Sequence, residues 1–480
     1  MKKTLIYIYC SMLLLQSACK QTLNALPENA KVDENTILDQ RTAEVALRGA
    51  YYLLYNIPGR GTNITSWDNH QWQPSYYAGY LAGSPNGPDE ENRYAEGFNI
   101  SSIWNESYTT INAANGIIGR IDRLPDAAFT EDRKNAIAAE ARFIRAYSHF
   151  RILSFYAEWF NYDSNYGILI RDELSNLDNI AKARSTVKQS YDFILTDIDF
   201  AIANAPAQNP NYYASKWSAM ALKMRVLMSR AQSGDHAEVV RIADQLIQNS
   251  PYRLETNARD IFRSKGLAST EVILGITPQP NQENSSFNIS YSYSNYTGQL
   301  TVSHYATKKL YDLFASGDPR RSWVTGALIP GTDRPGGRFF SKYIELNARP
   351  TIVSETSYAF RLSEVYLLKA EAISRLGSGM DEAKQILKLM LQRAGLTDLL
   401  FIDQINSYQE LQMQVFNEIS RNLVGEDGQD WIALLRLPFE TVKVLKPTIS
   451  SKAQYILPIP AQEFMTNPGI GDQNPGYSKN

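Results

Sequence analysis

The side chains best suited to hold a ligand lie in two polar stretches that are rich in aromatic rings. Aromatic faces can stack on the apolar CH faces of a sugar ring, while amides, carboxylates and guanidinium groups can satisfy its hydroxyls. The first stretch runs from Trp67 to Tyr80 and the second from Tyr291 to Gln299. Both mix Trp or Tyr with Asn, Gln or Asp, so both have the composition of a carbohydrate site.

Local chemistry selects nine candidate ligand contacts from these stretches and from a Gly- and Pro-rich loop further along the chain. They are Trp67, Asp68, Asn69, Trp72, Tyr77, Tyr291, Tyr293, Tyr296 and Arg338. Tyr291 and Tyr293 would project from one face of an extended segment, because side chains alternate along a strand. Arg338, like Arg334, would suit an acidic glycan because guanidinium groups bind carboxylates through paired hydrogen bonds. The alternative is structural, with the rings packing these loops onto the rest of the protein.

Catalytic and metal chemistry is not indicated by the sequence. The four histidines lack the paired spacing of metal ligands. Asp89-Glu90-Glu91 is a run of adjacent carboxylates in a polar loop, whereas glycoside hydrolysis needs two carboxylates held on rigid elements across the bond. Asp318-Pro-Arg-Arg321 could form an anion clamp, because guanidinium groups bind carboxylates through paired hydrogen bonds, but its proline makes a turn the favoured interpretation. We therefore expect no catalytic residue, no metal and no cofactor.

The N-terminus has the pattern of a lipoprotein signal. Two lysines and an apolar run over residues 5–15 precede Gln16-Ser17-Ala18-Cys19. The apolar run is too short to span a bilayer but has the length of a signal-peptide core. Small residues before a cysteine are what a lipoprotein signal peptidase requires. We expect cleavage after residue 18 and lipidation of Cys19, which would anchor the protein to a membrane and leave the mature chain without a free thiol.

The remainder of the chain shows mainly helical periodicity. Val187, Tyr191 and Ile194 begin an apolar series at steps of three and four, which predicts a helix packed on its neighbours. Residues 215–249 and 357–396 each have the pattern of a helix, a glycine-containing turn and a second helix, close to the length of a tetratricopeptide unit. One such hairpin cannot bury its own apolar face, so the hairpins must stack. We predict an all-α fold, namely a tetratricopeptide-like helical hairpin scaffold with long irregular, loop-rich insertions.

The predicted organisation is a signal peptide (1–18), a lipidated tether (19–40) and a single domain (41–480). Within the domain we expect a helical scaffold over about 41–270 and 351–436, loop-rich segments over about 56–105 and 279–350, and a closing segment over 437–480. Loops of this length are uncommon in a compact domain unless they have a function. The candidate ligand contacts all fall in the two loop-rich segments.

Composition and charge exclude several classes of protein. The chain has 480 residues, of which 44% are hydrophobic and 20% charged, so it is not a disordered tail protein. It carries 48 Lys and Arg against 50 Asp and Glu, a formal net charge of −2. Nucleic-acid surfaces need clustered positive charge, so we expect no nucleic-acid partner.

Several motifs occur in an order known from one protein family. They are Ala139-Glu-Ala-Arg-Phe-Ile-Arg-Ala-Tyr147, Arg184-Ser-Thr-Val187, Tyr358-Ala-Phe-Arg-Leu-Ser-Glu-Val-Tyr-Leu-Leu-Lys-Ala-Glu371, Arg393-Ala-Gly395, and Tyr455-Ile-Leu-Pro-Ile-Pro460 followed by Gln473-Asn-Pro-Gly-Tyr477. Through them the chain resembles the SusD/RagB family of nutrient-binding outer-membrane lipoproteins over nearly its whole length. The terminal motif is the most specific of the set.

The resemblance implies a location, a partner and a ligand class. Members of this family are lipid-anchored at the outer membrane, facing the cell exterior, and each acts as a lid for a SusC-like TonB-dependent transporter. They capture an oligosaccharide and are not enzymes, and their ligand-contacting aromatic residues come from loops in the two parts of the chain named above. Two alternatives remain open: a peptide-binding RagB-like member that uses the same loops, and a tetratricopeptide adaptor that binds only protein.

Overall fold

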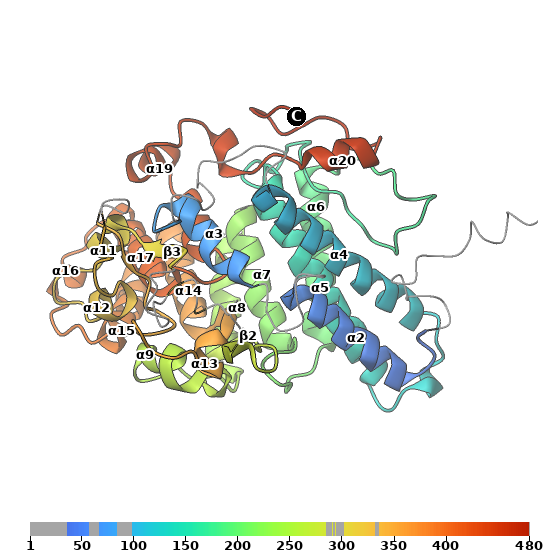
Figure 1. The fold of residues 1–480 in the computed structure, drawn as a ribbon, viewed down its shortest axis with the longest axis horizontal. Helices are drawn as coiled ribbons and strands as arrows, with labels where there is room; N and C mark the ends of the chain where they lie inside the picture. The colour runs from blue at the N-terminus through green and yellow to red at the C-terminus, as the bar shows by residue number, and fades with distance from the viewer. Residues whose placement is uncertain are drawn as a thin grey trace, which may run out of the picture.

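A computed structural model shows an array of packed helices (Figure 1). It describes residues 36–56, 67–83, 98–284, 290, 293, 302–331 and 336–479. The longer helices are α2 (Gln40–Tyr55), α4 (Phe98–Ile121), α5 (Arg133–Tyr156), α6 (Val187–Asn204), α7 (Lys216–Arg230), α8 (Asp235–Asn249), α14 (Leu362–Leu376), α15 (Met380–Arg393) and α17 (Tyr408–Leu423). The shorter helices are α3 (Asp68–Ala78), α9 (Ala258–Asp260), α11 (Lys308–Leu313), α12 (Arg320–Val324), α13 (Ile352–Glu355), α16 (Leu400–Asp403), α18 (Gln429–Leu435), α19 (Phe439–Leu445) and α20 (Ala461–Thr466).

The long helices follow one another across the molecule in chain order. Figure 1 shows α2, α4, α5 and α6 at one end, α7 and α8 in the middle, and α14, α15 and α17 at the other end. Each of α5, α6, α7 and α8 packs against the next, and α8 packs against α14. This succession is the stacking that the hairpin pattern predicts.

The two predicted hairpins are present. The first consists of α7 and α8, and α7 begins at a capping box in which the side chains and backbone amides of Ser215 and Ser218 pair. The second consists of α14 and α15, joined by a turn in which Gly377 and Gly379 have φ values of 66° and 82°. Residues with a Cβ rarely adopt that conformation, so glycine permits the tight reversal. The prediction of an all-α scaffold of tetratricopeptide-like hairpins is therefore confirmed.

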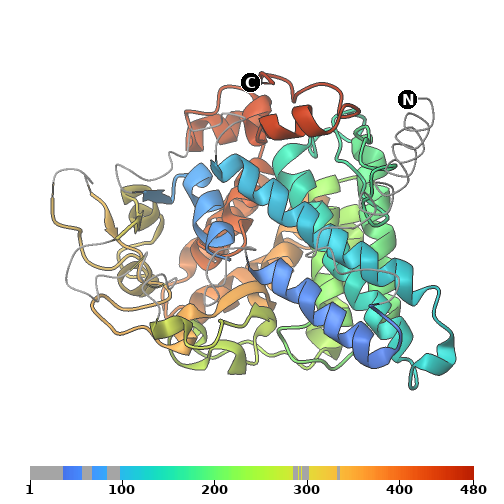
Figure 2. The same cartoon turned by 45° about the vertical axis from the view of Figure 1, so that its right-hand side comes forward.

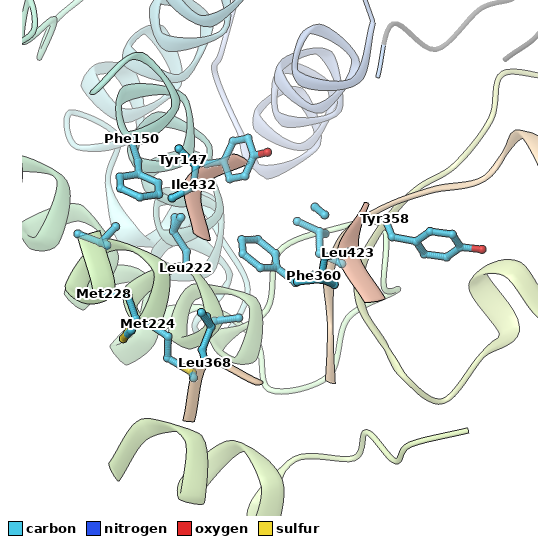
Figure 3. Close-up of a cluster of buried hydrophobic side chains, with 14 of the residues drawn as sticks. Tyr147, Phe150, Leu222, Met224, Met228, Tyr358, Phe360, Leu368, Leu423 and Ile432 are labelled. Atoms are coloured by element: carbon cyan, nitrogen blue, oxygen red, sulfur yellow. The ribbon is translucent and has the colours of Figure 1, made fainter. Parts of the chain in front are cut away.

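One hydrophobic core joins the layers. Figure 3 shows part of it, where Phe150 of α5, Met224 of α7, Leu368 of α14 and Ile432 of α18 converge. These side chains are at most 7% exposed. Burying an aliphatic or aromatic side chain of this size stabilises a fold by about 1.5–3 kcal/mol. Because the same cluster contains residues from Ile37 to Ile470, both ends of the described chain depend on it.

Two small antiparallel sheets complete the fold. Strands β1 (Leu81–Gly83), β3 (His304–Ala306) and β4 (Arg338–Phe339) form one sheet in the order β1-β3-β4. Strands β2 (Val272–Ile276) and β5 (Ser357–Arg361) form the other. In the first sheet Ala82 pairs with Tyr305, and Tyr305 pairs with Phe339. This sheet therefore joins the two segments that the sequence predicts to be loop-rich.

The C-terminal segment closes one face of the array. Figure 2 shows it as the red segment that crosses the top of the molecule. The side-chain amide of Asn474 donates to the carbonyls of Tyr156 and Leu457 at 2.8 and 2.7 Å. The amide of Asn467 donates to the carbonyl of Lys182 at 2.9 Å. The segment is thus fastened to the end of α5 and to the connection that follows it.

The structure corrects the expected extent of regular structure. The range 56–105, predicted to be loop-rich, contains α3, β1 and the start of α4, and the range 279–350 contains α11, α12, β3 and β4. Conversely, residues 157–186 lie in the predicted helical range but form no helix. The predicted signal peptide, Cys19 and residues 20–35 lie outside the described residues. In the part of the chain that is described, no helix combines the length and apolar character needed to cross a membrane.

Candidate ligand-binding site

The two predicted ligand-binding stretches lie side by side in the folded chain. Trp72 of α3 stacks on His304 of β3, with ring centroids 4.6 Å apart and an angle of 15° between the planes. The hydroxyl of Tyr293 donates to Oε1 of Gln71 at 3.0 Å, across 222 positions of sequence. Figure 1 shows α3 next to β3. Residues that are distant in sequence therefore form one region, with α3 on one side and the three-stranded sheet on the other.

The aromatic rings predicted to stack on a ligand are core residues in this structure. Their exposed fractions are 1% for Trp67, 5% for Trp72, 3% for Tyr77 and 1% for Tyr293. Trp67 stacks on His70 with centroids 3.7 Å apart, and Tyr293 stacks on Tyr343 at 6.1 Å. Because protein side chains already pack against these four rings, their burial favours a structural role, and their assignment to ligand contact stays a prediction. They hold the two stretches onto the helices, which is the structural alternative.

Helix α3 is enclosed on every side over residues 70–78, although this part of its sequence is rich in polar residues. Every residue from His70 to Ala78 is buried. Its polar side chains pair with distant partners: Gln71 Nε2 donates to Ser357 Oγ at 2.8 Å, and Ser75 Oγ donates to Asp430 Oδ2 at 2.5 Å. Buried polar groups need such partners. The polar residues that give this stretch the composition of a sugar site thus serve largely to hold the helix in place through buried hydrogen bonds.

Asp427 is the main acceptor beneath α3. The hydroxyl of Tyr147 donates to Oδ1 of Asp427 at 2.7 Å, and His70 Nδ1 lies 2.9 Å from the same oxygen. Arg225 forms an ion pair with Oδ2. Burial alone would raise the pKa of Asp427, but Arg225 and His70 lower it to about 2. Burial and the nearby Arg151 lower the pKa of His70 to about 3, so its imidazole is neutral and Nδ1 donates to the carboxylate.

Asp430 lies in the opposite electrostatic environment. It is 0% exposed, and its carboxylate accepts hydrogen bonds from Ser75 Oγ and from the backbone amide of Trp431. It forms no ion pair within the described ranges. Desolvation raises the pKa of Asp430 to about 7. Asp427 is therefore ionised near neutral pH, whereas Asp430, with a pKa of about 7, is only partly ionised there.

Arg338 differs from the four rings because its side chain is only partly buried. Strand β4 pairs Arg338 with Ala306, and a further bridge pairs it with Leu328, so its backbone is fixed. Its Nη1 donates to the carbonyl of Gly326 at 3.0 Å, and its Cζ lies 3.8 Å from the ring centroid of Tyr311. The structure therefore places a cation on the edge strand of the sheet that adjoins α3.

The remaining predicted contacts stay predictions. Asp68 and Asn69 are the first two residues of α3. Tyr291, Tyr296 and the lipidation site Cys19 lie outside the described residues.

The sequence gives no sign of a role for Tyr311, and for Arg321 it favours a turn over an anion clamp. In Asp318-Pro-Arg-Arg321 it is Arg320 that has the structural role, because its guanidinium pairs with Asp318 at 2.8 Å and with Glu418 at 2.6 Å, all three being buried. Arg321 instead lies over Tyr311. No local pattern brings Arg321, Arg338 and Tyr311 together before the pairing of β3 with β4 is known.

A separate cleft of about 440 Å³ lies between α4, residues 169–180 and α20. Trp104, Tyr108, Arg171 and Glu463 line it. Trp104 Nε1 donates to Glu463 at 3.2 Å, and Arg171 donates to the carbonyls of Asn179 and Ile180. Because these polar groups already have partners, we assign the cleft no ligand. Among the described residues, no group of three or more His, Cys, Asp or Glu side chains could hold a metal ion.

Comparison with known families agrees with this fold. A family described as "Starch-binding associating with outer membrane" matches residues 20–228, and one described as "SusD family" matches residues 328–443. The chain belongs to the SusD family.

Relatives of this SusD-family chain are distant in sequence. A SusD-like protein from Bacteroides ovatus is 25% identical over 58% of this chain and 50% of its own length, so the chain matches half of that protein. SusD-like protein P38 from Formosa agariphila is 24% identical over 96% of both chains.

Solved structures of the same superfamily share the fold. A SusD superfamily protein from Bacteroides thetaiotaomicron has a TM-score of 0.73 and 22% identity, covering 91% of this chain and 100% of that chain. A protein described as a laminarin binding SusD-like protein has a TM-score of 0.70 and 19% identity, covering 92% and 100%. The SusD fold of this chain is therefore established at the level of its helical architecture.

Proposed function

We propose that this SusD-family protein is an outer-membrane lipoprotein that captures an oligosaccharide at the cell surface. In this proposal Cys19 carries the lipid anchor, and the single domain acts as a lid for a SusC-like TonB-dependent transporter. The description of the matching family as starch-binding and associated with the outer membrane supports both the location and the ligand class. A laminarin binding protein of the same fold supports a glycan ligand.

The observation that carries the proposal is the meeting of the two aromatic-rich stretches on one side of the helical array. Trp72 and Tyr293 are positioning residues in this view, since they fix α3 and β3 against each other. A buried aromatic base of this kind gives a binding surface a rigid support. We assign ligand contact to the rim of this base, where Arg338 is only partly buried, and we keep Asp68 and Asn69 as predicted contacts.

Binding without catalysis suits the chemistry of the region. A glycosidase needs two carboxyl groups that reach the substrate on either side of the scissile bond. The carboxylates beneath α3 are Asp427 and Asp430, which are 6% and 0% exposed and are engaged by protein donors. Neither reaches the surface on which a glycan would lie.

The ligand class can be tested by affinity electrophoresis of the full-length protein, purified in detergent, through gels that contain laminarin, starch, polygalacturonate or κ-carrageenan. We expect retardation by at least one polysaccharide and no release of reducing ends. A protein that none of the four polysaccharides retards refutes the glycan proposal. Hydrolysis of a retarding polysaccharide, abolished by a single carboxylate substitution, refutes the non-catalytic role.

The anchor and the partner require a second experiment. Metabolic labelling with a fatty-acid analogue should mark the wild-type protein and should fail for Cys19→Ala. Cys10→Ala is the matched control, because that residue lies in the predicted signal peptide and should leave labelling unchanged. The labelled protein should co-purify with a TonB-dependent barrel. Recovery of Cys19→Ala with full labelling refutes the anchor, and recovery of the wild-type protein without any barrel refutes the lid.

A further inference from the structure

Two arginines share one aromatic ring, that of Tyr311 in α11, next to the three-stranded sheet. The Cζ atoms of Arg321 and Arg338 lie 4.0 and 3.8 Å from the ring centroid of Tyr311. The two Cζ atoms can therefore be no farther apart than the sum of these distances. Like charges at such a separation repel one another, and the repulsion is stronger at a partly buried position than in water. All three side chains are partly buried.

No carboxylate of the described chain neutralises this pair. Neither Arg321 nor Arg338 forms an ion pair with any residue in the described ranges. Two acidic residues near Arg321 and Tyr311 in sequence are engaged elsewhere, since Asp312 pairs with Lys308 and Asp318 pairs with Arg320. The face of Tyr311 attracts both cations, but a ring quadrupole offsets only part of a full charge.

The two guanidinium groups also retain unused donors. Arg338 donates one hydrogen bond, from Nη1 to the carbonyl of Gly326. The Nε of Arg321 is buried and has no hydrogen-bond partner in the structure. A buried donor without an acceptor is destabilising, so both the charge and the donors of this group favour an added acceptor that is negatively charged.

The backbone around the pair is held firmly. Arg338 lies in β4, which pairs with β3, and Tyr311 lies in α11, which begins directly after β3. Thr307 caps α11 through a bond from the amide of Leu310 at 3.3 Å, and its hydroxyl donates to the carbonyl of Gly79 at the end of α3. The arginine pair therefore has a fixed position relative to α3 and to the candidate ligand-binding rim.

We propose that Arg321 and Arg338, positioned on Tyr311, bind an anionic substituent of the captured saccharide. The substituent is a carboxylate or a sulfate, since both are oxyanions that accept paired hydrogen bonds from guanidinium groups. This inference rests on the proposed glycan-binding function and narrows it to acidic glycans. A neutral glucan would offer no anionic partner to the two uncompensated cations at the rim. The inference therefore distinguishes this protein from a binder of neutral glucans.

The test measures dissociation constants of the full-length protein by affinity electrophoresis at two salt concentrations. Polygalacturonate supplies carboxylates, κ-carrageenan supplies sulfates, and laminarin and starch are the neutral probes. The variants are Arg321→Gln, Arg338→Gln and Arg338→Lys. The matched control is Arg349→Gln, which removes one charge from an exposed arginine outside the pair. Thermal unfolding of every variant confirms that it is folded.

We expect the wild-type protein to bind one anionic polysaccharide more tightly than either neutral one, and to lose affinity as salt is raised. Arg321→Gln and Arg338→Gln should each weaken that binding about tenfold or more, because each removes a charge-assisted hydrogen bond. Arg338→Lys should weaken it less than Arg338→Gln, and Arg349→Gln should leave it unchanged. The polysaccharide that responds identifies the substituent as carboxylate or sulfate.

Three outcomes overturn the inference. Binding of a neutral polysaccharide, with no binding of either anionic one, refutes the acidic specificity but leaves the proposed function intact. Anionic binding that Arg349→Gln weakens as much as Arg338→Gln does refutes the assignment to this pair. Failure to bind any of the four polysaccharides refutes the proposed function and this inference with it.

Discussion

Substitution of Asp430 by Asn should stabilise the protein near neutral pH and should remove much of the pH dependence of its stability. Asp430 is fully buried, has no ion-pair partner in the described chain, and accepts a hydrogen bond from Ser75 of α3. Desolvation raises the pKa of its carboxyl from the ordinary 3.8 to about 7. Asn has the shape of the protonated side chain but cannot ionise.

The sign of the effect follows from proton linkage. Below about pH 4 the carboxyl is protonated in both the folded and the unfolded chain, so it imposes no penalty. As the pH rises from about 4 to 7 the unfolded chain loses the proton while the folded chain retains it, and the free energy of unfolding falls. A rise of about three pKa units corresponds to about 4 kcal/mol at about 1.4 kcal/mol per unit. Between pH 5 and pH 7 the loss should be about 2 kcal/mol.

The assay is urea-induced unfolding, followed by tryptophan fluorescence, of wild type and Asp430→Asn at several pH values from 5 to 7. Other groups titrate in the wild type and the variant alike, so the quantity of interest is the difference between the two free energies of unfolding. Lys342, whose pKa burial lowers to about 8, remains mostly protonated over this range. The difference should grow by about 2 kcal/mol from pH 5 to pH 7, in favour of Asn. Parallel curves for the two proteins would refute the reasoning, because they would mean that Asp430 is ionised in the folded state.

Two further substitutions test other parts of the structure. Asp427→Asn removes the charge that pairs with Arg225 and replaces one of the two acceptor oxygens, which serve Arg225 and Tyr147, with an NH2 group, so it should cost about 3 kcal/mol at pH 7. Because the pKa of Asp427 is lowered to about 2, this difference should shrink as the pH falls from about 4 to 2, and urea unfolding that shows no difference at pH 7 would contradict the network. Asn474→Ala leaves the carbonyl of Leu457 without a donor and that of Tyr156 with only the longer bond from Arg184, at 3.3 Å. It should therefore cost about 2 kcal/mol and should speed limited proteolysis within residues 437–480; an unchanged cleavage rate would show that the segment is held by other contacts.

The helical hairpins could be predicted because each has an amphipathic face that it cannot bury alone. In α7 and α8 the apolar residues recur at helical spacing, and glycines or capping residues mark the ends. The stacking of α8 on α14 follows from the same faces. The helix in the first loop-rich segment could not be predicted in this way. Helix α3 is buried all round, so its sequence has no polar face and no apolar face, and it contains Pro74.

The burial of the aromatic residues could not be predicted from the sequence either. Trp67 and Trp72 stand among polar residues, which suggests an exposed position when only the neighbouring sequence is considered. Those polar residues are themselves buried, because their partners are Asp427, Asp430 and Ser357. The sequence around each of these residues does not show which distant residue will be its hydrogen-bond partner. The position of Arg338 was easier to predict, since a guanidinium group in a Gly- and Pro-rich loop has little reason to enter a core.

The fastening of α3 also determines when the candidate site can form. His70 and Ser75 bind acceptors that lie 357 and 355 positions later in the chain. Contacts between such distant positions form late, since a long stretch of chain must first be ordered to bring them together. As the chain is synthesised from its N-terminus, α3 cannot dock until the residues up to Asp430 have been made. The candidate site therefore forms only once this part of the chain is complete, and a truncated product that retains both aromatic stretches would still lack it.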